Sequence, residues 1–260
     1  MGLPYDFFSH LTRLQSLNLS GLRIEVLPKS VYDLTELQWL ILKRCSNIKR
    51  FRRLKKWKKL VGLDLSGAIS FKNFAETGFK LLPKLQFLNL SNSMIRSLPF
   101  LRDITELNHL LVSGCQNLSR LPSIKSLSKL QVLDLSGAGI KEFQNHSFQK
   151  NVDLKILDLS ETAITWLPSN ISIHHFYLKG CSRLEKMNRL ESPEKLEVLD
   201  LSGSSSLVCN LFENSQSFKN KSQNSAPNFR HSETPGIITF ILFRLGKVAN
   251  LKFLKQTGGA

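Results

Sequence analysis

Large aliphatic residues recur in a fixed frame of seven positions, with Leu at the first, fourth and sixth and polar residues at most of the others. The frame reads LQSLNLS from Leu14, LVGLDLS from Leu60 and LQVLDLS from Leu130. Apolar and polar residues alternate over so few positions that each unit predicts one short strand. The nine starts lie 19 to 25 residues apart, at Leu14, Leu37, Leu60, Leu85, Leu107, Leu130, Leu154, Ile173 and Leu196.

This period and the Leu-x-x-Leu-x-Leu core are typical of a leucine-rich repeat, in which each unit gives one strand and a return segment. No unit can bury its own leucines, so neighbouring units must stack. The sequence therefore predicts an α/β repeat: a curved leucine-rich-repeat solenoid with a parallel sheet on its concave face and irregular or short helical return segments. Leucine-rich helices would need an apolar period of 3.6, which the L-x-L-S-G motif interrupts.

The units fall into three kinds that recur in order, which indicates that a block of three repeats was copied. The second kind carries a cysteine eight positions after its start, at Cys45, Cys115 and Cys181. Strands lie about 4.8 Å apart, so residues three repeats apart are separated by about 14 Å. A disulfide needs Cα atoms within about 7 Å. We therefore expect buried structural thiols, with neither a disulfide nor a metal site.

The most basic stretch, IKRFRRLKKWKKL at residues 48–60, holds eight cations and no acid. Large apolar residues recur at every third position, at Ile48, Phe51, Leu54, Trp57 and Leu60. This spacing predicts a return segment whose apolar side faces the core and whose cations face solvent. A disordered arm for nucleic acid is the weaker interpretation. The basic patch comprises Lys49, Arg50, Arg52, Arg53, Lys55, Lys56, Lys58 and Lys59.

Composition shifts along the chain predict three parts. Residues 1–209 form the leucine-rich repeats, about nine full units after a partial first unit; residues 210–236 read as a Ser/Asn-rich linker, and residues 237–260 as an apolar and basic tail of unassigned role. Solenoids need polar caps, and the first unit is partial, so we expect a segment of a longer protein. The longest apolar run, GIITFILF, is too short to span a bilayer, and the N-terminal residues MGLPYDFF do not read as a signal sequence. We expect a cytoplasmic protein, with the nucleus as the alternative.

Side chains at the third, fifth and seventh frame positions should face solvent on the sheet. Large aromatics there are the expected anchors of a protein interface. One cluster joins Trp39, Ile41 and Lys43, and a second surrounds Tyr177. The alternative is that each is only a solvated strand residue. The candidate protein-binding residues are Trp39, Ile41, Lys43, Phe87, His109, Asp158, His175, Tyr177, Lys179 and Asp200.

The same face offers residues with catalytic chemistry, but their arrangement does not favour an enzyme. His109 and His175 lie three repeats apart and cannot share a zinc ion. A hydrolase triad can be drawn from Ser160, Asp158 and His175, yet nothing predicts the pocket and oxyanion donors that it needs. We expect no enzymatic activity.

Two motifs together, LxLS…IxxLP and LxxLxLxxCxxLxxLP, resemble the repeats of plant nucleotide-binding leucine-rich-repeat immune receptors, the disease-resistance proteins. The residues that carry the resemblance are Leu17, Leu19, Ile24, Leu27 and Pro28; Leu110, Cys115, Leu118, Leu121 and Pro122; and Leu157, Leu159, Ile164, Leu167 and Pro168. It implies a non-catalytic module that senses a pathogen effector or a guarded host protein and contacts a nucleotide-binding domain.

The chain lacks the G-x-x-x-x-G-K-[ST] loop that holds phosphates. No cofactor is therefore expected here, and the ADP or ATP of the family would bind a domain absent from this chain. One alternative is a general intracellular leucine-rich-repeat scaffold in signalling, although such scaffolds favour Asn where this chain has Cys. A lower one is nucleic-acid binding through residues 49–59. The formal charge of +16 favours acidic partners of any kind.

Overall fold

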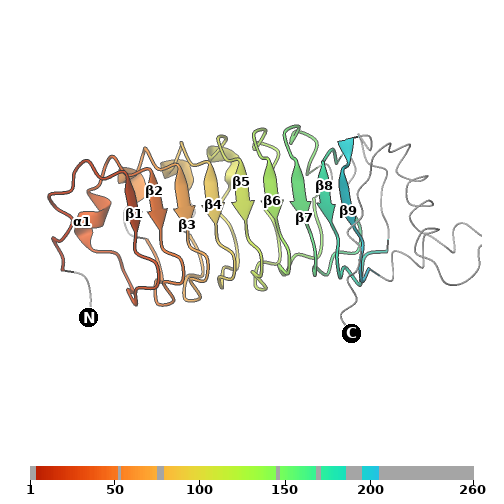
Figure 1. Ribbon diagram of the computed structural model, residues 1–260, viewed down its shortest axis with the longest axis horizontal. Coiled ribbons are helices and arrows are strands. Elements are labelled where there is room, and N and C mark those ends of the chain that lie inside the picture. Colours follow the sequence, from red (N-terminus) through yellow and green to blue (C-terminus); the bar gives the residue numbers. More distant parts are fainter. Residues whose placement is uncertain are drawn as a thin grey trace, which may run out of the picture.

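The computed structural model describes residues 4–51, 54–74, 79–144, 147–167, 171–185 and 195–204. Nine short parallel strands lie side by side in sequence order and form one sheet, as Figure 1 shows. The strands are β1 (Ser16–Asn18), β2 (Trp39–Ile41), β3 (Gly62–Asp64), β4 (Phe87–Asn89), β5 (His109–Leu111), β6 (Val132–Asp134), β7 (Ile156–Asp158), β8 (His175–Tyr177) and β9 (Val198–Asp200). The predicted repeat solenoid is confirmed.

The return segments are mostly irregular, as predicted. Helical structure in the described ranges consists of short pieces: the α-helix α1 (Lys29–Tyr32) and the 3-10 helices η1 (Leu54–Lys56), η2 (Phe79–Leu81) and η3 (Leu101–Asp103). Segments this short follow from repeats of 19 to 25 residues, which leave little chain for a return helix once the strand and its turns are formed. The solenoid is therefore dominated by its sheet.

The leucine frame builds the core because every strand pairs in register with the next. The fourth frame position falls at the centre of each strand, so that Leu17, Leu40 and Leu63 follow one another across the sheet. Leu40 and Leu63 are fully buried, as are their successors Leu88 and Leu110. Each unit thus covers the aliphatic side chains of its neighbours, and the stack shares one interior.

The basic stretch, residues 48–60, turns its apolar side chains into this interior, as their spacing predicted. Trp57 is fully buried; its ring stacks on Tyr32 with centroids 5.1 Å apart, and its Nε1–H donates a hydrogen bond of 3.2 Å to the carbonyl of Val31. Ile48 and Leu60 are also fully buried. The described cations of the patch lie outside, while Arg52 and Arg53 are outside the described residues.

Each strand ends in a turn whose eighth frame position has a left-handed backbone. Six of these nine residues are Gly, which adopts positive φ without a steric penalty. The other three are Arg44, Asn92 and Glu161, with φ of 57°, 55° and 57°. The glycines are Gly21, Gly67, Gly114, Gly137, Gly180 and Gly203. One backbone conformation therefore recurs in every unit, whichever residue occupies it.

The three described cysteines are free and buried. Each lies just after the turn and donates its thiol to a backbone carbonyl of the preceding unit. The Sγ atoms of Cys45, Cys115 and Cys181 lie 3.1 Å from the carbonyl oxygens of Leu19, Leu90 and Leu159, respectively. Burial raises the pKa of all three thiols. They act as small core groups with one polar contact.

Residues 205–260 lie outside the described part of the chain. The boundary at residue 209, the linker at 210–236 and the tail at 237–260 therefore stay predictions. The last strand described, β9 (Val198–Asp200), pairs with β8 in the same register as every earlier pair.

Candidate protein-binding site

The solvent-facing side of the sheet, called the sheet face below, presents side chains in rows that run across the strands. Because the strands pair in register, residues at one frame position stand next to each other in adjacent units. The third frame position gives the row Trp39, Gly62, Phe87 and His109 across β2 to β5. Neighbours in a row cover one another, so most residues of this face are half-buried and not fully exposed.

Three rings of this row form a continuous strip. The centroids of Trp39 and Phe87 lie 5.8 Å apart, although their strands are separated by β3. The centroids of Phe87 and His109 lie 6.0 Å apart. We call Trp39, Phe87 and His109 the aromatic strip. The exposed fraction of Trp39 is 39%, which is large for an indole in a folded protein.

Gly62 makes the strip possible. A Cβ placed on Gly62 would lie 2.1 Å from Cε3 of Trp39, far inside contact distance. The indole therefore lies flat over the backbone of β3, in the space that any other residue would fill, and from there it reaches Phe87. Gly62 is a positioning residue that sequence reasoning missed. Its signal was the gap in a row of large side chains between Trp39 and Phe87.

The aromatic strip carries no charge near neutral pH. Burial lowers the pKa of His109, which keeps its imidazole neutral. Its Nδ1 lies 2.7 Å from the side-chain oxygen of Asn108. The two other members of the first predicted cluster stand beside the strip on β2 and just after it. Ile41 is half-buried and Lys43 is exposed. An apolar strip with a polar border is the anatomy of a protein interface.

The second predicted cluster is brought together by the register. Tyr177 stands between Asp158 and Asp200 on the neighbouring strands, and Lys179 is exposed two residues further on. His175 pairs with Glu197, with 3.4 Å between Nε2 and the nearest carboxylate oxygen. Whether these residues bind a partner stays a prediction.

Both aspartates of this cluster also have a structural role. Oδ1 of Asp158 accepts the backbone N–H of Ser160, and Oδ1 of Asp200 accepts that of Ser202, each at 2.9 Å. Asn18 closes the same turn in the first unit. Burial raises the pKa of Asp158, and the nearby carboxylates of Asp134 and Asp200 raise it further. These acids hold the strand ends in place.

The described residues do not assemble a hydrolase triad from Ser160, Asp158 and His175. The carboxylate of Asp158 takes a backbone N–H, while the imidazole of His175 faces Glu197. Within the described ranges, no group of three or more His, Cys, Asp or Glu could hold a metal ion.

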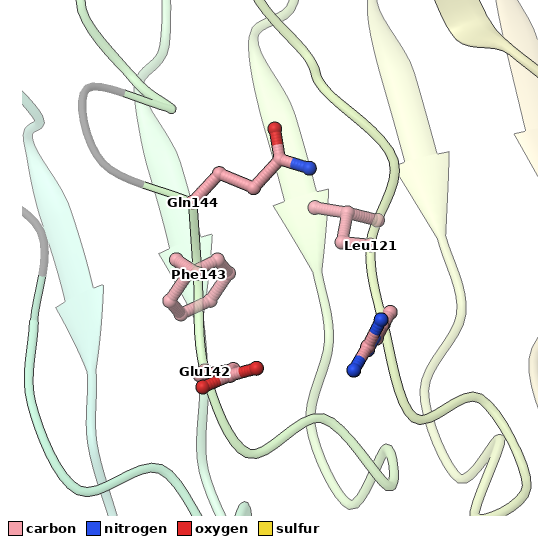
Figure 2. A pocket seen from close by; sticks show the side chains of 5 residues that line it. Leu121, Glu142, Phe143 and Gln144 are labelled. Carbon is pink, nitrogen blue, oxygen red and sulfur yellow. The ribbon is translucent and has the colours of Figure 1, made fainter.

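A shallow cleft opens between the returns of the fifth and sixth units (Figure 2). Leu121 and Phe143 are buried in its wall, and the side chains of Arg120, Glu142 and Gln144 are exposed at its rim. The cleft is open to solvent and gathers only one residue of each charge, so it does not resemble an enclosed small-molecule site.

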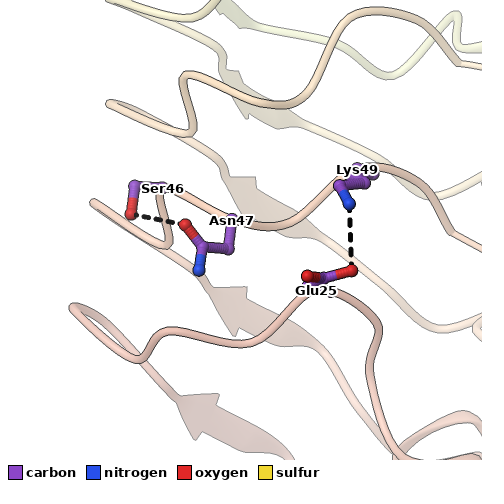
Figure 3. Close-up of polar contacts among 4 residues, drawn as sticks. All are labelled: Glu25, Ser46, Asn47 and Lys49. Carbon is purple, nitrogen blue, oxygen red and sulfur yellow. Dashed lines mark hydrogen bonds and ion pairs between the residues drawn. The ribbon is translucent and has the colours of Figure 1, made fainter.

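The basic patch is less basic than its sequence indicated. Lys49 pairs with Glu25 at 3.0 Å, as Figure 3 shows. Lys59 pairs with Glu36 at 2.7 Å, and Lys56 pairs with an aspartate of the same preceding unit, Asp33. Three of the patch cations thus meet acids one repeat away. Among the described patch residues, those without an ion pair are Arg50, Lys55 and Lys58.

Comparisons with known proteins give the family context of this geometry. No protein-family model matches the chain. A probable disease resistance protein of Arabidopsis thaliana is 36% identical over 225 residues, which cover 78% of this chain and 18% of the relative. A second Arabidopsis protein named for disease resistance is 32% identical over 230 residues, covering 78% of this chain and 19% of the relative. The chain is a homologue of plant disease resistance proteins.

This chain spans less than a fifth of the length of these two relatives. Solved structures support its fold alone. An internalin from Listeria monocytogenes has a TM-score of 0.54 at 18% identity and covers 77% of this chain and 60% of its own. A TDR receptor structure has a TM-score of 0.52 at 19% identity and covers 80% of this chain and 43% of its own. None of the helices in the described ranges has the length and apolar character of a membrane span.

Proposed function

We propose that this chain is a non-catalytic protein-interaction module of a plant immune receptor and that it binds its partner on the sheet face. The observation that carries the proposal is the aromatic strip, in which Trp39 lies over Gly62 and contacts Phe87. The disease-resistance names of its relatives support a role in defence signalling. The partner would be a pathogen effector, a guarded host protein or a nucleotide-binding domain.

The physical properties of the strip suit a protein partner. Its rings are held by their neighbours before binding, so little side-chain entropy remains to be lost when a partner docks. Trp39 is 39% exposed, and covering its apolar indole with a partner lowers the free energy of the complex. Trp is also among the residues that most often dominate interface energetics. The strip lies across β2 to β5, whose strands pair in register, and this pairing fixes its shape.

The repeat fold and the relatives suggest a module without enzymatic activity. We propose that no catalysis takes place on the sheet face and that no nucleotide binds this chain. Polar side chains of this face such as Asp158 and His175 already contact a turn N–H and a neighbouring carboxylate, respectively. The cytoplasm is the proposed compartment, because buried free thiols such as Cys115 suit a reducing environment.

A binding screen with matched variants tests the proposal. The chain would be screened by yeast surface display against libraries of pathogen effectors, host immune proteins and host housekeeping signalling proteins. Each binder would then be titrated against the native chain, Trp39→Ala and Phe87→Ala. Loss of a hot-spot aromatic costs about 2 kcal/mol or more, which is about a thirtyfold rise in Kd. Binders that depend on the strip should show this loss in both variants.

Val152→Ala is the control, because Val152 is an apolar residue of a return segment with 71% of its surface exposed. Its removal should leave every Kd unchanged. Binders that keep full affinity for Trp39→Ala and Phe87→Ala would refute the sheet face as the binding site. A general scaffold role would be favoured if only housekeeping signalling proteins bound through the strip.

A further inference from the structure

A row of cations crosses four consecutive return segments. Lys55, Lys80 and Arg102 are the middle residues of η1, η2 and η3. Lys125 continues the row, because each of the four stands five residues before the start of the next leucine frame, at Leu60, Leu85, Leu107 and Leu130. We call Lys55, Lys80, Arg102 and Lys125 the basic ladder. The ladder is not apparent as a charge cluster in the sequence, because its members lie 22 to 25 residues apart.

All four ladder side chains are exposed, and none takes part in an ion pair with the described residues. Lys58 and Lys84, which stand near the row, are also exposed and unpaired within the described ranges. The nearby acids are mostly engaged elsewhere. Glu106 pairs with Lys129 at 2.8 Å, and Asp103 is the half-buried exception beside Arg102. The positive charge of the ladder is therefore not offset by ion pairs with described residues.

The ladder lies in the most positively charged part of the sequence. Residues 49–129 contain sixteen Lys and Arg and four Asp and Glu, a net charge of +12 out of the total +16. In the first part of this range, acids of the preceding unit neutralise Lys49, Lys56 and Lys59. The unpaired surplus thus falls on the returns of the second to fifth units, where the ladder lies.

We propose that the basic ladder is a second protein-binding surface, separate from the sheet face, that takes an extended acidic segment of polypeptide. Adjacent strands are about 4.8 Å apart, so four rungs on the returns outside the sheet span at least about 14 Å. An extended chain advances about 3.3 Å per residue, and the ladder therefore matches at least about five residues of a partner. Asp and Glu carboxylates at successive positions could reach successive rungs, each contact being a charge-assisted hydrogen bond.

The structure favours an acidic polypeptide over nucleic acid. Proteins that bind single strands combine cations with aromatic rings on which bases stack. Trp57 is fully buried and Phe51 is packed against the core. Phe100, next to the ladder, is 64% exposed, but the guanidinium carbon of Arg102 lies 5.1 Å from its ring centroid and occupies part of the face on which a base would stack. The ladder is also a single line of charge, whereas a duplex presents two lines of phosphates.

The test uses the full chain and fluorescence anisotropy with three labelled probes: a peptide of about ten glutamates, and single-stranded and duplex DNA of equal charge. The ladder variant is Lys55→Glu/Lys80→Glu/Arg102→Glu. The control variant, Lys141→Glu/Lys155→Glu/Arg183→Glu, changes the net charge equally at exposed cations that form no ion pair with described residues. Thermal unfolding checks that both fold, and a Lys/Arg→Gln version of the ladder variant removes charge without reversing it.

We expect the glutamate peptide to bind the native chain, with affinity falling about tenfold or more in the ladder variant and about twofold or less in the control. Trp39→Ala should leave peptide binding unchanged, which separates this proposal from the function of the sheet face. Equal losses in both triple variants would show that only net charge matters and would overturn the proposal. Absence of peptide binding, or DNA binding tighter than peptide binding near physiological salt and lost in the ladder variant, would overturn it too.

Discussion

The Gly62→Ala substitution would break the aromatic strip by adding one methyl group. The new Cβ would stand 2.1 Å from Cε3 of Trp39. Carbon atoms in contact lie about 3.5–4.0 Å apart, so the indole must retreat by about 1.5 Å or more. The neighbouring group is the rigid indole ring, which cannot yield by bending as a flexible side chain can. Trp39 would therefore lose its place over β3 and its contact with Phe87.

The size of the effect follows from these contacts. An aromatic pair contributes about 0.5–1.5 kcal/mol, and forcing a methyl group into an occupied space costs about 1–3 kcal/mol. Replacing Gly by Ala returns about 0.4–1 kcal/mol through the unfolded chain. We expect the free energy of unfolding to fall by about 1–2 kcal/mol, which lowers the Tm of a domain of this size by about 2–8 °C. Acrylamide should also quench Trp39 more strongly.

A double-mutant cycle supplies the control. In the Trp39→Ala background the space over Gly62 is empty, so Gly62→Ala should be neutral or stabilising there. Thermal and urea unfolding of the four proteins would measure the coupling between the two sites, which we expect to be about 1–3 kcal/mol. The same loss of stability in both backgrounds would refute the reasoning, because the indole would then not occupy the space over Gly62.

Three other substitutions test the fold around the site. Glu161→Gly should raise the free energy of unfolding by about 0.5–1 kcal/mol in chemical unfolding. Glu161 has φ of 57°, and a left-handed backbone costs a residue with a side chain about 1–2 kcal/mol; the greater flexibility of Gly in the unfolded chain offsets part of this gain. A lower stability would count against this prediction. Asp158→Asn should raise the Tm at pH 7 and change it little at pH 3, because the pKa of Asp158 is raised in the folded state and its ionisation therefore costs stability as pH rises. Asn is compatible with the turn, since Asn89 closes the equivalent turn in its own unit. An equal shift of the Tm at both pH values would contradict this. Trp57→Phe should cost about 1–3 kcal/mol, because it removes one of two hydrogen bonds to the carbonyl of Val31, which keeps the N–H of Leu34, and leaves part of the buried indole volume empty. Thermal unfolding with no loss of stability would show that the indole is dispensable.

The basic stretch shows how far the sequence reaches. Its apolar residues at every third position predicted a buried face, and Trp57 and Leu60 are fully buried. Its charge was predicted less well. Lys59 meets Glu36 and Lys49 meets Glu25 because in-register stacking brings the return of one unit beside the next. Residues 23 or 24 positions apart become neighbours only once the number of residues in each return is fitted to the stack.

The candidate site shows the same limit. The frame predicted which side chains face solvent, including Trp39 and His109. It grouped Trp39 with Ile41 on the same strand, whereas the ring contact of Trp39 crosses to Phe87 two strands away. That contact depends on the missing side chain of Gly62, whose signal in the sequence is only a gap in a row of large side chains. The turn role of Asp158 was equally invisible, because a carboxylate that caps a strand end has the same sequence as one that binds a partner.

By itself, the sequence determined that this chain is a stack of repeats with a shared leucine interior, because burying an aliphatic side chain every two or three residues leaves the backbone few alternatives. Only the tertiary structure decided which surface residues act together. Hydrophobic burial is set by each residue and its local period, whereas a strip or a row of charge depends on lateral contacts between units. Those contacts are fixed by the register of neighbouring units, which places Trp39 over Gly62 and Lys80 beside Arg102. The linear pattern of hydrophobic and polar residues does not show these neighbours.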